Sequence, residues 1–340
     1  MNAGHVTALA AVAATSLLLV ACGTSPTNPE VPDLGNAEPQ TSDASTSPAG
    51  EVLALDLDVS DLEAAGDILG LRAGGTLALG TVEEFRSGAT RDVTVPEHCG
   101  DLTAAADTFV LACGDEVLLI DATTGDIDTH PVSDSDAVPA ASAVLTSTGE
   151  LVVGSGENDR VVVFVDGAEE NSISVAGLTS QLLAVPVAGA DDAVVRTNHE
   201  NTTIQDVHWR DGRQGGTLRV GLGIGQAAAG DRGLVLASDN RGGQLAVYTA
   251  DNVVRLHQTV PVAGSPWAVA WDSERELAWV STTADNQLHA FELSTGVPEP
   301  VGAVDTVADA HNVVVLADGT LVIASATGDG VQIITDPEFS

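Results

Sequence analysis

The sequence predicts an all-β protein, a seven-bladed β-propeller, and three observations support this fold class. Apolar runs of four to six residues alternate with Asp, Asn, Ser and Gly, a pattern typical of strands and turns. A unit of about four such strands recurs roughly every 42 residues, which is the spacing of propeller blades. Finally, a strand pattern that precedes the first unit supplies what the last unit lacks.

The composition fits a repeat protein of this kind. The chain has 340 residues, which exceeds the usual size of a single-core domain unless repeats share the core. It contains 35 Gly and 44% hydrophobic residues, but only 3% aromatic residues. Its apolar content is therefore mostly Val, Ala and Leu in short runs, which argues against intrinsic disorder.

The charge is strongly negative, with 49 acidic residues against 12 Arg, no Lys and a formal net charge of -37. Such a surface repels phosphate backbones and anionic headgroups, so we expect no nucleic-acid partner. An acidic surface that keeps the protein soluble is the simpler interpretation. A specific role in collecting cations is the alternative.

The N-terminus predicts an exported, lipid-anchored protein. Residues 6–20 form an uncharged apolar run of signal-peptide length, too short to span a membrane comfortably. The sequence Leu-Val-Ala-Cys follows at residues 19–22 and resembles a bacterial lipobox, although residues 1–5 carry no Lys or Arg. We therefore interpret residues 1–21 as a lipoprotein signal peptide and Cys22 as the lipidated residue. The expected location is the extracytoplasmic face of the cell membrane.

The rest of the N-terminal region predicts a tether followed by the propeller. Residues 22–50 are mostly Ser, Thr, Pro, Asn, Asp and Glu, and such a segment buries too little surface to offset its ordering entropy. We expect a disordered tether over residues 22–50 and the propeller over residues 51–340.

One central strand per blade can be placed from the sequence. The expected strands are residues 76–81, 109–114, 151–156, 193–198, 234–240, 277–283 and 321–327. The first interval, 33 residues, is shorter than the others. The last unit supplies only three strands, whereas residues 51–59 (EVLALDLDV) form a strand pattern without a partner. Because an open ring would leave two exposed edges, we expect residues 51–59 to complete the last blade.

Two of the units also carry a family resemblance. PWAVAWD at residues 266–272 with LAWVS at 277–281, and HNVVV at 311–315 with DGTLV at 318–322, resemble the repeat of YVTN-type propellers. The chain as a whole is similar to actinobacterial envelope lipoproteins of the LppL type. The resemblance implies the propeller fold and the envelope location, but propellers of this kind perform many unrelated functions.

Cys99 and Cys113 are the only thiols besides Cys22. In an exported protein, two Cys at this spacing indicate a disulfide, and a metal half-site built on both thiolates is the alternative. A disulfide that closes this loop of about 15 residues would contribute roughly 3 kcal/mol of stability in the chain-entropy model. The surrounding HC and ACGDEVLL segments are similar to periplasmic zinc-chaperone propellers, which carry a His-rich N-terminal stretch, whereas residues 22–50 contain no His.

Candidate ligand-binding residues occur in two groups. Alignment of the units on their inner strands places Gln181, Gln226, Trp267 and His311 at the mouth of the central channel. A second group, Asn198, His199, Glu200 and His208, lies in the least regular unit, and irregular loops on a rigid scaffold often bind ligands.

The function predicted from these features is a binding or scaffold module for an envelope protein, a glycan or a small ligand. We assign no catalytic residue, since no nucleophile elbow of the G-x-S-x-G type occurs. We also expect a monomer without a cofactor. The alternative is a metal-handling or metal-dependent hydrolytic propeller with zinc or calcium, based on His311, residues 198–211 and the acidity.

Overall fold

The computed structural model describes Met1, residues 34–55 and residues 57–339. Residues 34–340 form one compact unit, which contains every element discussed below. The expected signal peptide and Cys22 lie outside the described residues. No helix in the described part of the chain is long and apolar enough to cross a membrane.

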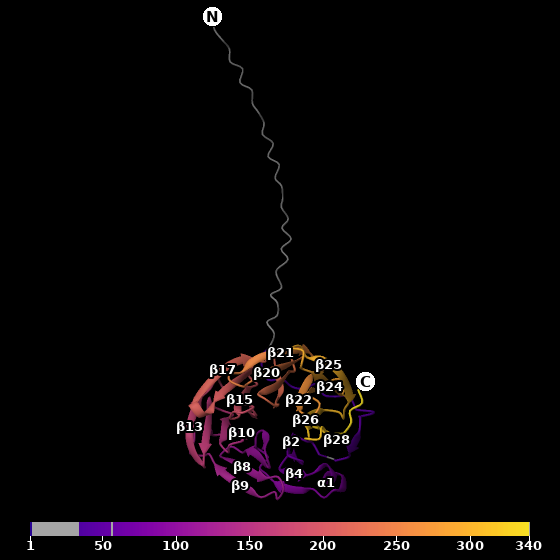
Figure 1. Ribbon diagram of the computed structural model, residues 1–340, viewed down its shortest axis with the longest axis horizontal. Helices are drawn as coiled ribbons and strands as arrows, with labels where there is room; N and C mark the ends of the chain where they lie inside the picture. Colours follow the sequence, from indigo (N-terminus) through magenta and orange to yellow (C-terminus); the bar gives the residue numbers. More distant parts are fainter. Residues whose placement is uncertain (2–33, 56, 340) are drawn as a thin grey trace. The chain divides into compact units, whose positions relative to one another are not determined.

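The compact unit is a ring of seven antiparallel sheets, each with four strands, as predicted (Figure 1). Blade 1 consists of β2 (Asp61–Ala65), β3 (Ile68–Ala73), β4 (Thr76–Gly80) and β5 (Arg91–Thr94). The helix α1 (Val82–Ser87) lies between β4 and β5. Blade 2 consists of β6 (Leu102–Ala105), β7 (Thr108–Ala112), β8 (Glu116–Asp121) and β9 (Ile127–Pro131).

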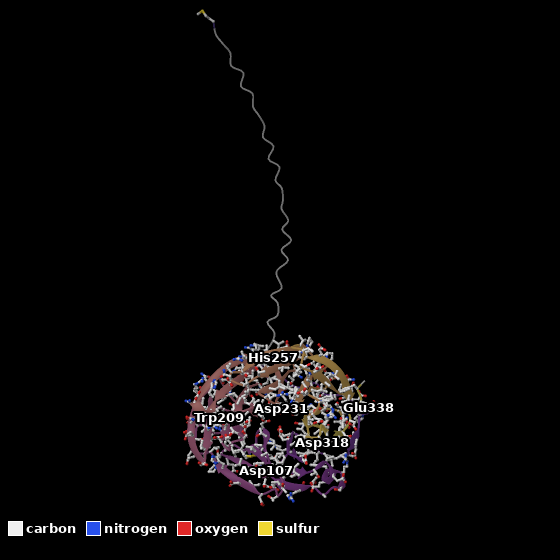
Figure 2. All side chains as sticks on the ribbon, viewed as in Figure 1. Asp107, Trp209, Asp231, His257, Asp318 and Glu338 are labelled. Carbon is white, nitrogen blue, oxygen red and sulfur yellow. A yellow bond between two sulfur atoms is a disulfide. The ribbon has the colours of Figure 1, made fainter. Side chains whose placement is uncertain are left out.

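Blades 3 to 5 follow in chain order. Blade 3 consists of β10 (Ala140–Leu145), β11 (Leu151–Ser155), β12 (Arg160–Val165) and β13 (Ala168–Ser174). Blade 4 consists of β14 (Gln181–Val185), β15 (Ala193–Asn198), β16 (Thr203–His208) and β17 (Arg213–Arg219). Its 3₁₀ helix η1 (Trp209–Asp211) lies at the rim of the ring, where Figure 2 labels Trp209. Blade 5 consists of β18 (Ile224–Ala229), β19 (Leu234–Asp239), β20 (Gln244–Thr249) and β21 (Arg255–Pro261).

The last two blades close the ring. Blade 6 consists of β22 (Pro266–Asp272), β23 (Leu277–Thr282), β24 (Gln287–Glu292) and β25 (Glu299–Asp305). Blade 7 consists of β26 (Ala310–Val315), β27 (Leu321–Ser325), β28 (Val331–Ile334) and β1 (Glu51–Leu53). The N-terminal strand β1 pairs antiparallel with β28, so the predicted closure is confirmed. The paired strand is shorter than the expected residues 51–59.

One predicted central strand is wrong. The second strand of blade 1 is β3, whereas the expected residues 76–81 contain the third strand, β4. Two residues interrupt the apolar run of β3: Gly70 and the buried Arg72. Gly70 is required by packing, because a Cβ there would lie 2.8 Å from the ring of Phe109. When the second strand of blade 1 is counted as β3, the spacing between the second strands of blades 1 and 2 is close to that of the other blades.

The hydrophobic core lies between blades. Each of the seven clusters of buried side chains combines residues of two neighbouring blades. For example, Leu77 and Leu79 of blade 1 pack with Phe109 and Leu111 of blade 2. The many Val, Ala and Leu residues of the sequence therefore form seven small cores around the ring rather than one large core.

The two thiols near blade 2 form the predicted disulfide. Cys99 and Cys113 are bonded, with their Cα atoms 4.0 Å apart. The bond joins the segment that precedes β6 to the residue that follows β7. Both thiols are used in this bond, so the alternative of a metal half-site on the two thiolates is excluded.

Residues 34–50, which we call the strap, differ from the expected disordered tether. The strap lies along loops that join the outer strand of one blade to the inner strand of the next. The Ser42 backbone N–H donates to Asp309 Oδ1, and the Asp309 N–H donates to Ser42 Oγ, both at 2.8 Å. Further on, Ser45 Oγ donates to the Thr306 carbonyl at 2.5 Å. The small polar residues that predicted disorder instead satisfy backbone groups of the propeller, and the remaining expected tether, residues 22–33, lies outside the described residues.

Candidate binding site in the central channel

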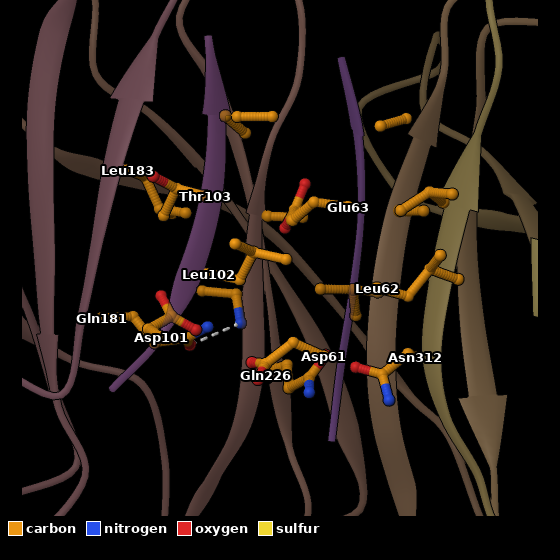
Figure 3. Close-up of a pocket in the computed structure, with 18 of the residues that line it drawn as sticks. Asp61, Leu62, Glu63, Asp101, Leu102, Thr103, Gln181, Leu183, Gln226 and Asn312 are labelled. Carbon is orange, nitrogen blue, oxygen red and sulfur yellow. Dashed lines mark hydrogen bonds between the residues drawn. The ribbon is translucent and has the colours of Figure 1, made fainter. Parts of the chain in front are cut away.

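A cavity of about 260 Å³ lies in the channel of the propeller (Figure 3). The inner strands of blades 1, 2, 4, 5, 6 and 7 line most of it, and blade 3 contributes Val144. Much of the wall consists of alanines, including Ala64, Ala104, Ala184 and Ala228. The short side chains at these positions leave room for a ligand where larger residues would fill the channel.

Polar side chains form a layer at one end of this cavity. Figure 3 shows Asp61, Asp101, Gln181, Gln226 and Asn312 together at the ends where the inner strands begin. We call these five residues the polar ring.

Glu63 lies one layer further along the channel, beside Thr103 and Leu183 (Figure 3). Its carboxylate occupies the space between β2 and β6. Asp61 and Glu63 are two residues apart on β2, and alternate residues of a strand share one face. The channel therefore presents carboxylates at two depths.

The three carboxylates have perturbed pKa values. Burial, together with the neighbouring Asp101 and Asp61 carboxylates, raises the pKa of Glu63 to about 8. Burial and the Asp61 charge also raise the pKa of Asp101 to about 8, although hydrogen bonds from Ser142 and Gln181 oppose this. Burial likewise raises the pKa of Asp61, against the lowering effect of the Arg72 charge. Glu63 and Asp101 are thus largely protonated at neutral pH.

Arg72 is the cation that faces these carboxylates. Its Nη1 atom lies 3.2 Å from Asp61 Oδ2. The same guanidinium donates to the Cys99 carbonyl at 2.8 Å and to the Gly100 carbonyl. Arg72 therefore holds the disulfide-bonded segment that leads into β6, and its charge offsets one of the three carboxylates.

The amide side chains of the polar ring leave hydrogen-bonding capacity toward the cavity. Gln181 Oε1 accepts a bond from the Ala227 N–H at 3.1 Å. Asn312 is 5% exposed, and its Nδ2 donates to the Val59 carbonyl at 3.2 Å. No group in the described part of the chain donates to Asn312 Oδ1, which points into the cavity in Figure 3. A ligand with hydrogen-bond donors would satisfy this oxygen.

The four residues predicted at the channel mouth occupy different places. Gln181 and Gln226 line the cavity, but Trp267 and His311 do not. The rings of Trp267 and His311 instead face one another, with centroids 5.7 Å apart. The pairing register shifts at the start of β22 and β26, where these two residues lie. On β26 the cavity is lined from Asn312 onward, the residue after His311.

The polar residues of the second predicted group are not brought together. Asn198 ends β15 and is followed by His199 and Glu200, whereas His208 ends β16 beside η1 at the rim. Asn198 binds the Leu178 carbonyl and the Asn201 N–H, at 2.8 and 2.6 Å. Burial lowers the pKa of His199 to about 4. His208 Nε2 lies 3.7 Å from Asp206 Oδ2. Asn198 thus has a structural role within blade 4.

The geometry does not assemble a metal centre from the acidic and His residues. Over residues 34–55 and 57–339, no group of three His, Cys, Asp or Glu side chains is placed to hold a metal ion. His311 Nε2 lies 4.0 Å from Asp309 Oδ1 and has no hydrogen-bond partner within these residues.

Sequence reasoning missed Asp61, Glu63, Asp101 and Asn312. The signal for the first two is the alternation in DLEAA at residues 61–65, which places both carboxylates on one face of a strand. The expected strands of the first blade leave out residues 61–65, because residues 76–81 are expected as its central strand. Asp101 directly precedes β6, whereas Asp61 and Gln181 are the first residues of β2 and β14.

Fold and site together define a seven-bladed β-propeller with an acidic, partly apolar central channel. Neither a family model nor a curated protein matches the chain. Among solved structures, a streptogramin B lyase matches with 13% identity and a TM-score of 0.66, over 85% of this chain and 98% of that one.

Two further solved structures have the same fold. A chain of the mitotic checkpoint complex matches with 12% identity and a TM-score of 0.64, over 98% of this chain and 99% of that one. Virginiamycin B lyase from Staphylococcus aureus matches with 12% identity and a TM-score of 0.62, over 83% and 97%. At these identities the similarity shows the fold alone.

Proposed function

We propose that the protein is an extracytoplasmic, lipid-anchored binding protein that holds a small molecule in its central channel. The observation that carries the proposal is the cavity itself, in which Asn312 Oδ1 and the carboxylates of Asp61, Asp101 and Glu63 face open space. Concave sites with a few converging polar groups on apolar walls are typical of small-molecule binding. A protein or glycan partner, the alternative expected from the sequence, would bind the outer surface of the ring.

The experiment for the channel is a thermal-shift screen of the full chain against amines, sugars, carboxylates and divalent cations. Ala104→Phe would fill the channel, and Ala168→Phe is the matched control, because Ala168 is exposed on the outer strand β13. We expect one chemical class to raise the midpoint of the wild-type protein and of the control variant, but not that of the channel variant. Circular dichroism checks that each variant is folded.

The anchor requires a separate experiment, because Cys22 lies outside the described residues. Its support is the lipobox-like sequence at residues 19–22. We expect the wild-type chain in the membrane fraction of the cells and Cys22→Ala in the soluble fraction, since several acyl chains on one Cys anchor a protein stably. Retention of Cys22→Ala in the membrane fraction would contradict the anchor and leave the channel proposal unaffected.

A further inference from the structure

We propose that the ligand of the channel is a diamine or polyamine, with one ammonium group in the polar ring and a second at Glu63. This inference rests on the proposed function and names its ligand class. Four properties of the channel support it: the spacing of the carboxylates, the balance of donors and acceptors, the apolar wall between them and the protonation of the empty site.

The spacing of the carboxylates along the channel matches a short diamine. Asp61 and Glu63 are two residues apart on β2, which separates them by about 6.7 Å along the strand. A four-carbon chain of bonds of about 1.5 Å separates its two terminal nitrogens by roughly 6 Å. A molecule such as 1,4-diaminobutane, aligned with the channel, would therefore place one nitrogen in each carboxylate layer.

The balance of donors and acceptors favours an ammonium group. An ammonium has three donors and no acceptor. The polar ring offers it the Asp61 and Asp101 carboxylates and the unpaired Asn312 Oδ1. Arg72 already donates to Asp61, Cys99 and Gly100, so its charge leaves most of the acidity of the channel uncompensated.

The remaining walls suit a hydrocarbon chain. Ala64, Ala104, Leu183 and Ala228 line the channel without offering side-chain hydrogen bonds. A metal ion needs ligands that converge on one point, whereas these carboxylates lie in two layers.

The protonation of the empty channel fits the same ligand. Glu63 faces Asp61 on its own strand and Asp101 next to β6, and Arg72 is the cation opposite Asp61. The pKa values of Glu63 and Asp101, raised to about 8, fall when an ammonium group takes the place of water. Amines with pKa values near that of Lys, about 10, stay charged to pH 9. Binding should therefore strengthen between pH 6 and pH 9.

The test is isothermal titration of the full chain with 1,4-diaminobutane, butylamine, glucose and calcium chloride. The variant is Glu63→Gln, and the matched control is Glu170→Gln, because Glu170 is exposed on β13 and receives the same substitution. We expect the wild type and the control to bind the diamine at least about tenfold more tightly than butylamine. Glu63→Gln should lose this preference while its affinity for butylamine changes little. Asp101→Asn should weaken the binding of both amines.

Other outcomes separate this inference from the function on which it rests. If the diamine gives no heat but another class in the thermal-shift screen depends on Ala104, the ligand class is wrong and the channel proposal stands. If calcium binds more tightly than the diamine, the site holds a metal ion and not an organic cation. If no class binds in a way that depends on Ala104, both proposals fail. An unchanged diamine preference in a folded Glu63→Gln variant would also overturn the inference.

Discussion

At the residue scale, the channel brings three carboxyl groups close together in a buried position. Glu63 and Asp101 lie close to one another and to Asp61, and only Arg72 offsets the three carboxylates. Groups whose pKa values are strongly shifted inside a cavity mark candidate functional sites. The raised pKa of Glu63 also makes the free energy of unfolding depend on pH, even without a ligand.

Stability should fall as the pH rises, because the folded protein keeps Glu63 protonated. The folded pKa of Glu63 is raised from 4.5 to about 8. Its contribution is therefore fully present below pH 4.5 and is lost as the pH rises toward 8. We expect the free energy of unfolding of the wild type to decrease between pH 5 and pH 8, relative to Glu63→Gln, by roughly 1 to 2 kcal/mol. Denaturant unfolding at both pH values measures the difference, and parallel curves for the two proteins would refute it.

Residue identities in the channel were only partly predictable from the sequence. The disulfide pair was found because the expected export and the small number of Cys leave few alternatives. Gln181 was placed correctly, since β14 pairs with β15 without a register shift. Trp267 and His311 lie outside the cavity, at irregular positions of β22 and β26 that no residue pattern in the sequence announces.

At the element scale, the strap and β1 show how the N-terminal segment joins the propeller. The closing strand was predictable because the last blade lacked a strand and an alternating pattern was available. The contacts of the strap were not predictable, since a Ser-rich composition indicates low burial but does not reveal which backbone groups the side chains will bind. Its backbone bonds extend from Gly35, which donates to the Leu222 carbonyl, to Ala49, which donates to the Asp305 carbonyl.

We expect the strap to stabilise the propeller through Ser42. Ser42 Oγ accepts a bond from the Asp309 N–H and donates to the Thr283 carbonyl at 2.7 Å. Ser42→Ala would leave both backbone groups without this partner, at a cost of about 1 to 2 kcal/mol. Ser47→Ala is the matched control, because Ser47 is exposed within the same strap. Thermal unfolding compares the two variants, and equal midpoints would show that the strap contributes nothing at this point.

At the scale of the whole molecule, the ring explains both the composition and the channel. Seven small cores between blades require many medium-sized apolar residues and few aromatic ones, as the sequence has. The period of about 42 residues predicted the number of blades, because each blade must repeat the same four strands. The ligand was not predictable in this way, since residues from all seven blades line the cavity and no local pattern connects them.

The central claim, that a cationic ligand occupies the acidic channel, is tested most directly by counting the protons released on binding. Titration of the full chain with 1,4-diaminobutane at pH 7.5, in two buffers of different ionisation enthalpy, gives that number. Because Glu63 and Asp101 have pKa values of about 8 in the empty channel, we expect about one proton or more to be released per ligand. Glu63→Gln should reduce this number and Glu170→Gln should not. Binding of the diamine without proton release would contradict the account.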